Sequence, residues 1–346
     1  MIRETGSLRS SEIRPALQRE QNSLRQSRSV VVLELEHLDL VKILLRILLF
    51  TTASSALAQQ VPTISTKVQV VAIFATVHDR DGRVVKNLTP DDFVLEEDGV
   101  PQKIDYFVKE SDLPLTVGLL VDTSWSQREV LEPERRASYT FLDQVLRQPK
   151  DQAFVVRFDT GVETLQGLTS ARSELASALD RLSIPEHFGT LIFSAVKDSS
   201  ENPMRQQQGR KAFILLTDGV AFRDPTGIGT AIEFAQRADT IIYSIRFSDP
   251  VALYRPVRAA IRGPAKERGK EGLHRMAEET GGMSCEVTKG QSMEEIYAQI
   301  EDALRNQYSI GYTPSRQSSD GKYHKIKLTP RDRHLVVHAR DGYYAN

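Results

Sequence analysis

Between residues 113 and 306, short apolar runs alternate with amphipathic helical patterns. Leu115–Val121 and Ala212–Leu216 are two uninterrupted runs, and Ile241–Phe247 predicts a further strand. A strand that is apolar on both faces has to be covered on both faces, which is typical of parallel sheets flanked by helices. Strands and helices that alternate in this order predict an α/β fold with a doubly wound, mostly parallel sheet.

The helices of this region are predicted from their periodicity and from the residues at their ends. Ser292 and Glu295 are spaced as a capping box, which predicts a helix that runs to Asn306. Residues 249–271 contain prolines and several basic residues, and we expect a long loop there. The other predicted elements are the helices Pro133–Leu146, Ala171–Leu182, Thr230–Ala238 and Leu273–Glu279, and the strand Phe154–Phe158.

The segments on either side predict β structure. Lys67–Val77 alternates apolar and polar residues, and Phe93–Leu95 and Ile104–Val108 flank the hairpin signal Asp98-Gly99. Neither flank alone has enough strands for a stable sheet, so we expect both to form one small β domain that holds the α/β domain as an insertion. The predicted strands after Gln307 are Tyr308–Tyr312, Tyr323–Leu328 and Leu335–Ala339.

These patterns divide the chain into four parts. We expect residues 1–58 to be an extension plus a signal peptide, and 67–112 to be the first half of the β domain. Residues 113–306 are the expected α/β domain, and 307–346 the second half of the β domain.

The amino-terminal part carries an export signal. Lys42–Phe50 is a short basic and apolar run, and Ala56-Leu57-Ala58 supplies small residues for cleavage after Ala58. A membrane span needs about 20 apolar residues, and this run is far shorter, so we expect no transmembrane span in the mature chain. The alternative to a signal peptide is that this segment is a buried amphipathic helix. Residues 1–40 are polar and mixed in charge, and we hypothesise that they are a mis-assigned extension. The protein is therefore expected to be exported, to the periplasm or outside the cell.

The overall charge argues against nucleic-acid binding. The chain has 45 Lys and Arg against 46 Asp and Glu, so there is no basic excess to neutralise phosphates. Cys285 is the only cysteine, which excludes an internal disulfide and a cysteine-based zinc site.

Candidate metal ligands follow the first apolar strand. Asp122, Ser124 and Ser126 stand directly after Leu115–Val121, and ligands of doubly wound sheets bind beyond the carboxyl ends of strands. One carboxylate and two hydroxyls are hard oxygen donors of the kind that Mg²⁺ and Ca²⁺ take. Alone, this spacing also fits an ordinary turn.

Two further residues complete the set. Asp218 follows the strand Ala212–Leu216, and Thr190 precedes a helical pattern. A turn at Asp218-Gly219 and a helix cap at Thr190 are the alternatives. Together, Asp122, Ser124, Ser126, Thr190 and Asp218 resemble the metal-ion-dependent adhesion site of von Willebrand factor type A domains.

The resemblance covers about residues 113–306, and the flanking Leu88–Phe93 and Ala339–Tyr343 look like a bacterial exported subfamily. It implies a Mg²⁺, or another divalent cation such as Mn²⁺ or Ca²⁺, held directly by the two serines and the threonine. It implies that both aspartates act largely through waters, and that a carboxylate from a protein or peptide partner can complete the shell. Trp125 departs from the family, where a small residue is common; it could contact a ligand or anchor the loop.

Three functions compete. The first is an exported, metal-dependent adhesion or interaction module. The second is a structural or assembly protein in which the metal is incidental, and the third is a Mg²⁺-dependent phosphoester hydrolase. An enzyme needs a general base or nucleophile near the ion, and the sequence offers no candidate, so we expect no catalytic activity.

Overall fold

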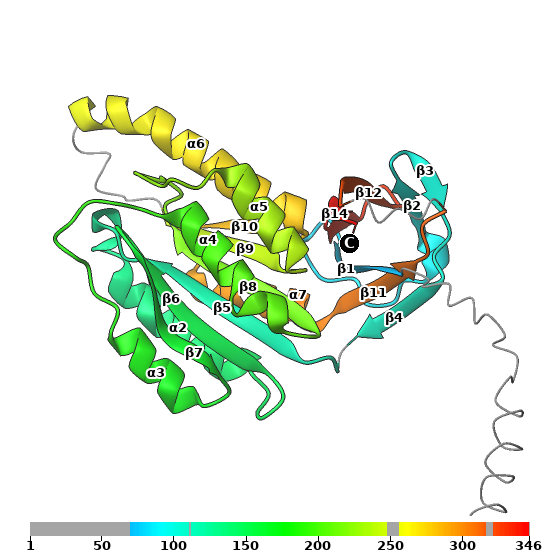
Figure 1. Cartoon of the computed structure of the whole chain (residues 1–346), viewed down its shortest axis with the longest axis horizontal. Helices are drawn as coiled ribbons and strands as arrows, with labels where there is room; N and C mark the ends of the chain where they lie inside the picture. The colour runs from blue at the N-terminus through cyan, green and yellow to red at the C-terminus, as the bar shows by residue number, and fades with distance from the viewer. Residues whose placement is uncertain (1–69, 111, 248–255, 316–320, 346) are drawn as a thin grey trace, which may run out of the picture. The chain divides into compact units, whose positions relative to one another are not determined.

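A computed structural model of the chain describes residues 70–110, 112–247, 256–315 and 321–345, without the side chains of residues 110 and 256–263. At the centre of the α/β region lies a six-stranded sheet in the order β10-β9-β8-β5-β6-β7 (Figure 1). All neighbouring strands are parallel except β6 and β7, which confirms the predicted fold class. The strands are β5 (Leu115–Asp122), β6 (Gln152–Phe158), β7 (Val162–Thr169), β8 (Arg210–Thr217), β9 (Ile241–Phe247) and β10 (Ser284–Val287).

Helices cover both faces of this sheet. One core cluster joins the sheet to α2, α3 and α7 through Phe141, Leu175 and Ile300. The other joins the opposite face to α4, α5 and α6, and Figure 1 shows α4 and α5 in front of the sheet. The bounds are α2 (Leu131–Val145), α3 (Arg172–Asp180), α4 (Ile192–Glu201), α5 (Ile228–Arg237), α6 (Pro256–Thr280) and α7 (Met293–Arg305), with short 3₁₀ turns at Pro90–Asp92, Trp125–Gln127 and Met204–Gln206.

Strand β5 is buried along its whole length. Leu119 packs into one core cluster and Leu120 into the other, as expected because successive residues of a strand face opposite sides of the sheet. Gly118 leaves space for the rings of Phe154 and Phe213, which meet edge to face at 6.3 Å. The apolar run that predicts this strand is therefore also the reason for its central place.

Strands of the two flanks interleave in two antiparallel sheets, β13-β1-β11-β4 and β14-β12-β2-β3. Each sheet combines strands from before and after the α/β region, so that region is an insertion, as predicted. Their shared core contains Ile73, Tyr308 and Ile326. The strands are β1 (Val71–His78), β2 (Phe93–Glu97), β3 (Val100–Gln102), β4 (Tyr106–Glu110), β11 (Gln307–Tyr312), β12 (Tyr323–Pro330), β13 (Val336–Ala339) and β14 (Gly342–Tyr344).

The hairpin prediction is partly wrong. Asp98 and Gly99 do form the turn, both with positive φ, but β2 pairs with the three-residue strand β3. The predicted partner, Ile104–Val108, instead overlaps β4, which pairs with β11 in the other sheet. A period-two pattern places a strand but does not choose its neighbour.

The prediction of a long loop at residues 249–271 is wrong for the described residues from 256 onward. Helix α6 begins at Pro256, where a missing N–H costs nothing, and it carries Pro264 in its interior. Its later turns bury Leu273 and Met276 against the sheet, which outweighs the poor helix propensity of its first half. The predicted extension and signal peptide lie outside the described residues. No helix in the described ranges is both long enough and apolar enough to cross a membrane.

The two connections of the insertion are held by buried charges. Arg210, 1% exposed, donates from its guanidinium to the carbonyls of Leu113 and Leu304, one at each connection. Asp151 accepts from the backbone N–H of Leu115 at 2.9 Å and from Arg305 at 2.9 Å. Entry and exit of the α/β region are therefore tied to the same two side chains.

Candidate metal centre

The candidate ligands gather where β5 and β8, which are adjacent and parallel, reach their carboxyl ends. Asp122 closes β5 and is fully buried. Its Oδ1 accepts from the backbone N–H of Ser124 at 2.8 Å, and its Oδ2 accepts from the hydroxyl of Thr217 on β8 at 2.6 Å. The carboxylate is thus fixed between the two strands before any ligand is considered.

The 3₁₀ turn Trp125–Gln127 brings two serine hydroxyls together. The Oγ atoms of Ser124 and Ser126 are 3.1 Å apart. Adjacent ligands of an octahedral Mg²⁺ lie about 3.0 Å apart, because the metal–oxygen distance is about 2.1 Å. The pair therefore has the spacing of two neighbouring ligands on one ion.

A two-way backbone bridge positions Thr190. The N–H of Thr190 donates to Phe222 at 3.0 Å, and the N–H of Phe222 donates back at 3.1 Å. The helix-cap alternative for Thr190 is wrong, because the N-cap of α4 is Leu191 and the first N–H groups of that helix donate to Asp224. The Thr190 hydroxyl is therefore not occupied in starting the helix.

Asp218 follows β8 and is 6% exposed. Its Oδ1 accepts from the backbone N–H of Val220 at 3.0 Å, so the residue does form a turn, as the alternative interpretation predicts. That bond engages one carboxylate oxygen. The turn and a role toward a ligand are therefore compatible.

A cavity of about 460 Å³ brings Ser124, Ser126, Thr190 and Asp218 to one surface, with Asp122 buried beneath. Three aromatic side chains share its lining and are unusually exposed: Trp125 at 44%, Phe188 at 62% and Phe222 at 49%. Exposed apolar side chains grouped around polar residues mark interaction sites. The sequence singles out Trp125, but neither phenylalanine carries a sequence signal for this position.

Cations lie over two of these rings. The guanidinium of Arg128 is 4.9 Å from the ring centre of Trp125, and that of Arg223 is 5.3 Å from the ring centre of Phe222. Trp125 and Phe188 meet edge to face at 6.2 Å. Two of the three exposed rings of the cavity therefore have an arginine beside them.

Two carboxyl groups close to the cavity, those of Asp122 and Glu134, have raised pKa values. Burial, and then the nearby Asp218, raise the pKa of Asp122 to about 7 despite the hydroxyls of Thr217 and Ser124. Glu134 on α2 is 1% exposed, and neither of its oxygens has a hydrogen-bond partner among the described residues. Burial and both aspartates raise the pKa of Glu134 well above its usual range.

A cation beside these groups would offset their repulsion, and every donor is a hard oxygen, so a divalent ion fits the site. Glu134 is not among the site residues that the sequence predicts. The signal was a carboxylate on the apolar face of the predicted helix Pro133–Leu146, three and four residues ahead of the buried Ala137 and Ser138.

A second group of potential ligand atoms, from Glu97, Asp98 and His324, lies within 4.8 Å in the described part of the chain. It belongs to the β region. Nδ1 of His324 is hydrogen-bonded to Asp98 at 2.8 Å, and Asp98 also accepts from the N–H of Lys325. These hydrogen bonds connect Asp98, in the turn between β2 and β3, to β12, so the group has a structural role at this turn.

No protein-family model matches the chain, and no curated protein matches it. Among solved structures, protein BatB from Bacteroides thetaiotaomicron is 17% identical over 56% of this chain and 100% of that chain, with a TM-score of 0.41. Proximal thread matrix protein 1 from the mussel byssus, with a zinc-occupied metal-ion-dependent adhesion site (MIDAS) motif, is 14% identical over 61% of this chain and 50% of that chain, with a TM-score of 0.47. The vWF domain of the type V pili tip protein Mfa5 from Porphyromonas gingivalis is 12% identical over 57% of this chain and 97% of that chain, with a TM-score of 0.42. Likenesses this distant say nothing about what this chain binds.

Proposed function

We propose that this chain is an exported binding module that uses a divalent cation, Mg²⁺ in the first place, to hold a carboxylate of a protein or peptide partner. Residues 113–306 would be the metal-binding domain, of von Willebrand factor type A kind, between the β segments 67–112 and 307–346. Ser124, Ser126 and Thr190 would hold the ion directly. The observation that carries the proposal is the cavity in which these hydroxyls meet Asp218 under an exposed aromatic rim.

The donor set suits binding. Hydroxyl ligands are neutral, so an ion held by them keeps its attraction for an incoming carboxylate. Asp122 has both oxygens engaged by Ser124 and Thr217, which favours a role through water rather than direct contact. The rings of Trp125 and Phe222 supply apolar area for the residues beside the partner's carboxylate, as aromatic anchors do in interfaces.

Hydrolysis of a phosphoester is the weaker alternative. It would require a base that reaches the bound substrate. Among the residues that the structure describes, the lining of the cavity contains one carboxylate, Asp218, and Glu134 is buried and does not line it. A structural or assembly protein with an incidental metal is the other alternative. The grouping of three exposed aromatic side chains around the candidate ligands favours a metal that takes part in binding.

The test is metal binding by calorimetry at pH 7.5 in the purified chain. We expect Mg²⁺ or Mn²⁺ to bind, and Asp122→Ala and Asp218→Ala each to weaken binding by at least about tenfold. Asp81→Ala is a matched control, because its side chain is 65% exposed in a turn of the β region. Parent-like metal binding by both site variants would refute the assignment.

The partner is tested by capture from an exported fraction, with Mg²⁺ and with chelator. Capture should require the metal and should fall when Trp125→Ala and Phe222→Ala are combined, while metal affinity stays as in the parent. Capture that persists in chelator would favour the structural alternative.

A further inference from the structure

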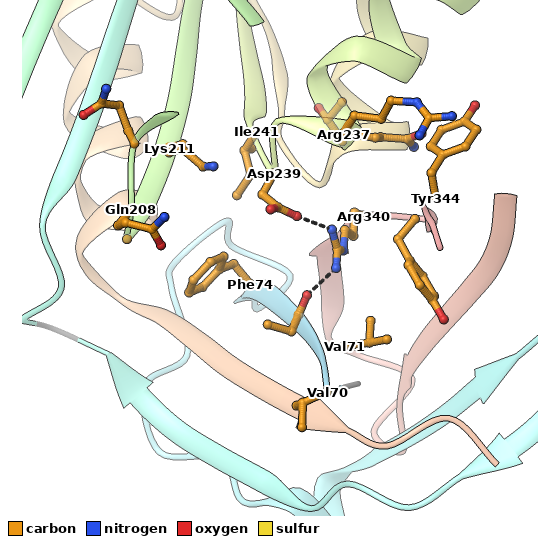
Figure 2. A pocket seen from close by; sticks show the side chains of 16 residues that line it. Val70, Val71, Phe74, Gln208, Lys211, Arg237, Asp239, Ile241, Arg340 and Tyr344 are labelled. Atoms are coloured by element: carbon orange, nitrogen blue, oxygen red, sulfur yellow. Dashed lines mark hydrogen bonds and ion pairs between the residues drawn. The ribbon is translucent and has the colours of Figure 1, made fainter. Parts of the chain in front are cut away.

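Figure 2 shows a second cavity, of about 270 Å³, which lies at the other end of the central sheet from the candidate metal centre. Lys211, the second residue of β8, lines it, whereas Asp218 follows the last residue of the same strand. At about 3.3 Å per residue, these two positions are roughly 23 Å apart. The cavity is also lined by β1 and by the carboxyl-terminal residues Arg340 and Tyr344.

Lys211 is a buried lysine that lines this cavity. Only 7% of the residue is exposed, and Figure 2 shows its side chain reaching from β8 toward Ile241 and Asp239. Within the described residues its ammonium makes neither a hydrogen bond nor an ion pair. Burial lowers the pKa of Lys211, and the nearby Asp239 opposes this only in part. A buried charge is costly unless it is paired.

The carboxylate lining the cavity is already engaged. Asp239 accepts from the guanidinium of Arg340 at 2.7 Å, and Arg340 also donates to the carbonyl of Ala72, as the dashed lines in Figure 2 mark. Arg237 is held by Glu233 at 2.9 Å and lies 4.0 Å from the ring centre of Tyr344. Both arginines are therefore fixed by neighbours, and the ammonium of Lys211 is left for a ligand.

The rest of the cavity sets the size and character of that ligand. Val71, Phe74 and Ile241 give it apolar walls. A volume of about 270 Å³ is at the lower end for ligand pockets. One available ammonium matches the single charge of a carboxylate, whereas a phosphate dianion is held by several donors.

We propose that this cavity binds a small monocarboxylate, whose oxygens pair with the ammonium of Lys211 and whose apolar body packs against Phe74 and Ile241. The carboxylate could belong to a free organic acid or to the end of a peptide chain, since both present the same group. The site is independent of the metal centre.

The test titrates the full chain with benzoate, N-acetyl-leucine, benzamide and inorganic phosphate, by calorimetry in the presence of chelator. Chelator removes any carboxylate binding that depends on a metal, so the outcome is separate from that of the proposed function. We expect benzoate or N-acetyl-leucine to bind. Tighter binding of benzoate would indicate a free organic acid as the ligand, and tighter binding of N-acetyl-leucine the end of a peptide chain. The neutral benzamide should bind at least about tenfold more weakly than the better carboxylate.

Lys211→Met keeps most of the side-chain volume and should weaken carboxylate binding at least about tenfold, whereas Lys103→Met, at an 88% exposed side chain, should not. In the unmodified chain, NMR of the lysine side chain should show that benzoate raises the pKa of Lys211, which does not depend on the variant folding. Equal binding of benzamide, tighter binding of phosphate, unchanged affinity in Lys211→Met, or a Lys211 that does not respond would each overturn the proposal.

Discussion

Glu134 is a buried carboxylate that opposes folding in the absence of a cation. Its pKa is raised in the folded state. At neutral pH the folded chain must therefore keep a buried charge or take up a proton, whereas the unfolded chain does neither, so folding is less favourable. We expect Glu134→Gln to stabilise the metal-free chain by about 1–2 kcal/mol and to reduce the extra stability gained on adding Mg²⁺. Thermal unfolding with and without Mg²⁺ measures both effects.

A matched control lies on the same helix. The side chain of Glu132 is 62% exposed and pairs with Arg135 at 2.6 Å, so Glu132→Gln should change stability by less than about 1 kcal/mol in either condition. A metal-free Glu134→Gln chain that is less stable than the parent would contradict this prediction, because it would mean that the buried carboxyl has a stabilising partner.

His78 gives the fold a defined sensitivity to acid. It is 7% exposed, Nδ1 lacks a partner among the described residues, and its ring lies 5.1 Å from that of His338. Burial, and then His338, lower the pKa of His78 from 6.5 to about 4, against the opposing charges of Asp302 and Asp79. Between these two values the unfolded chain binds a proton that the folded chain does not, so stability falls as the pH falls.

The His78 contribution to this loss reaches roughly 2–3 kcal/mol by pH 4.5. Urea unfolding at pH 7 and pH 4.5 should therefore show a smaller drop for His78→Gln than for the parent. His334→Gln is the control, because its side chain is 47% exposed and no buried ring is removed. An identical drop in parent and His78→Gln would contradict the assignment.

At the scale of elements, the packing of β5 against its neighbouring strands requires a glycine at position 118. A Cβ on Gly118 would overlap the rings of both Phe154 and Phe213. Gly118→Ala should therefore cost about 1–3 kcal/mol in unfolding free energy, the usual range for overpacking a core. Gly167→Ala on β7 meets no atom within 4 Å and serves as the control in the same denaturation experiment. Equal stability of the two variants would show that the rings can move apart.

Sequence could predict the elements that hold the candidate site, because the signals of those elements are local. Ala212–Leu216 is apolar throughout and Leu115–Val121 is apolar except for Thr116, so the pattern predicts that both strands lie in the centre of the sheet. Strand β7 was missed because Val162–Thr169 has no buried residue and lies at the sheet edge. Which flanking strands pair with which depends on distant contacts, so the two β sheets could not be predicted.

The candidate site was predictable only in its polar ligands. Asp122 ends β5 and Asp218 directly follows β8, and these places in the chain are visible in the sequence. Phe188 and Phe222 reach the same cavity through the backbone bridge between Thr190 and Phe222, a contact between residues far apart in the chain. The cavity around Lys211 depends on the return of Arg340 to β1 and is equally invisible in the sequence.

At the scale of the whole molecule, the export prediction concerns residues outside the described ranges. If cleavage follows Ala58, mass spectrometry of the native protein should find an amino terminus at Gln59, with or without cyclisation. Detection of the intact chain from Met1 in the cytoplasm would refute both the signal peptide and the mis-assigned start.

The insertion has a mechanical consequence. The chain leaves the β region at the end of β4 and returns at the start of β11, and Glu110 and Gln307 face each other across these paired strands. If the proposed partner pulls on the candidate metal centre, the tension would pass from the α/β region into both strands at once. Arg210 donates hydrogen bonds to the carbonyls of both connections. We expect the load to be shared, so Arg210→Met should lower the rupture force measured by single-molecule pulling on a bound partner. A rupture force equal to the parent's would show that the two strands carry tension separately.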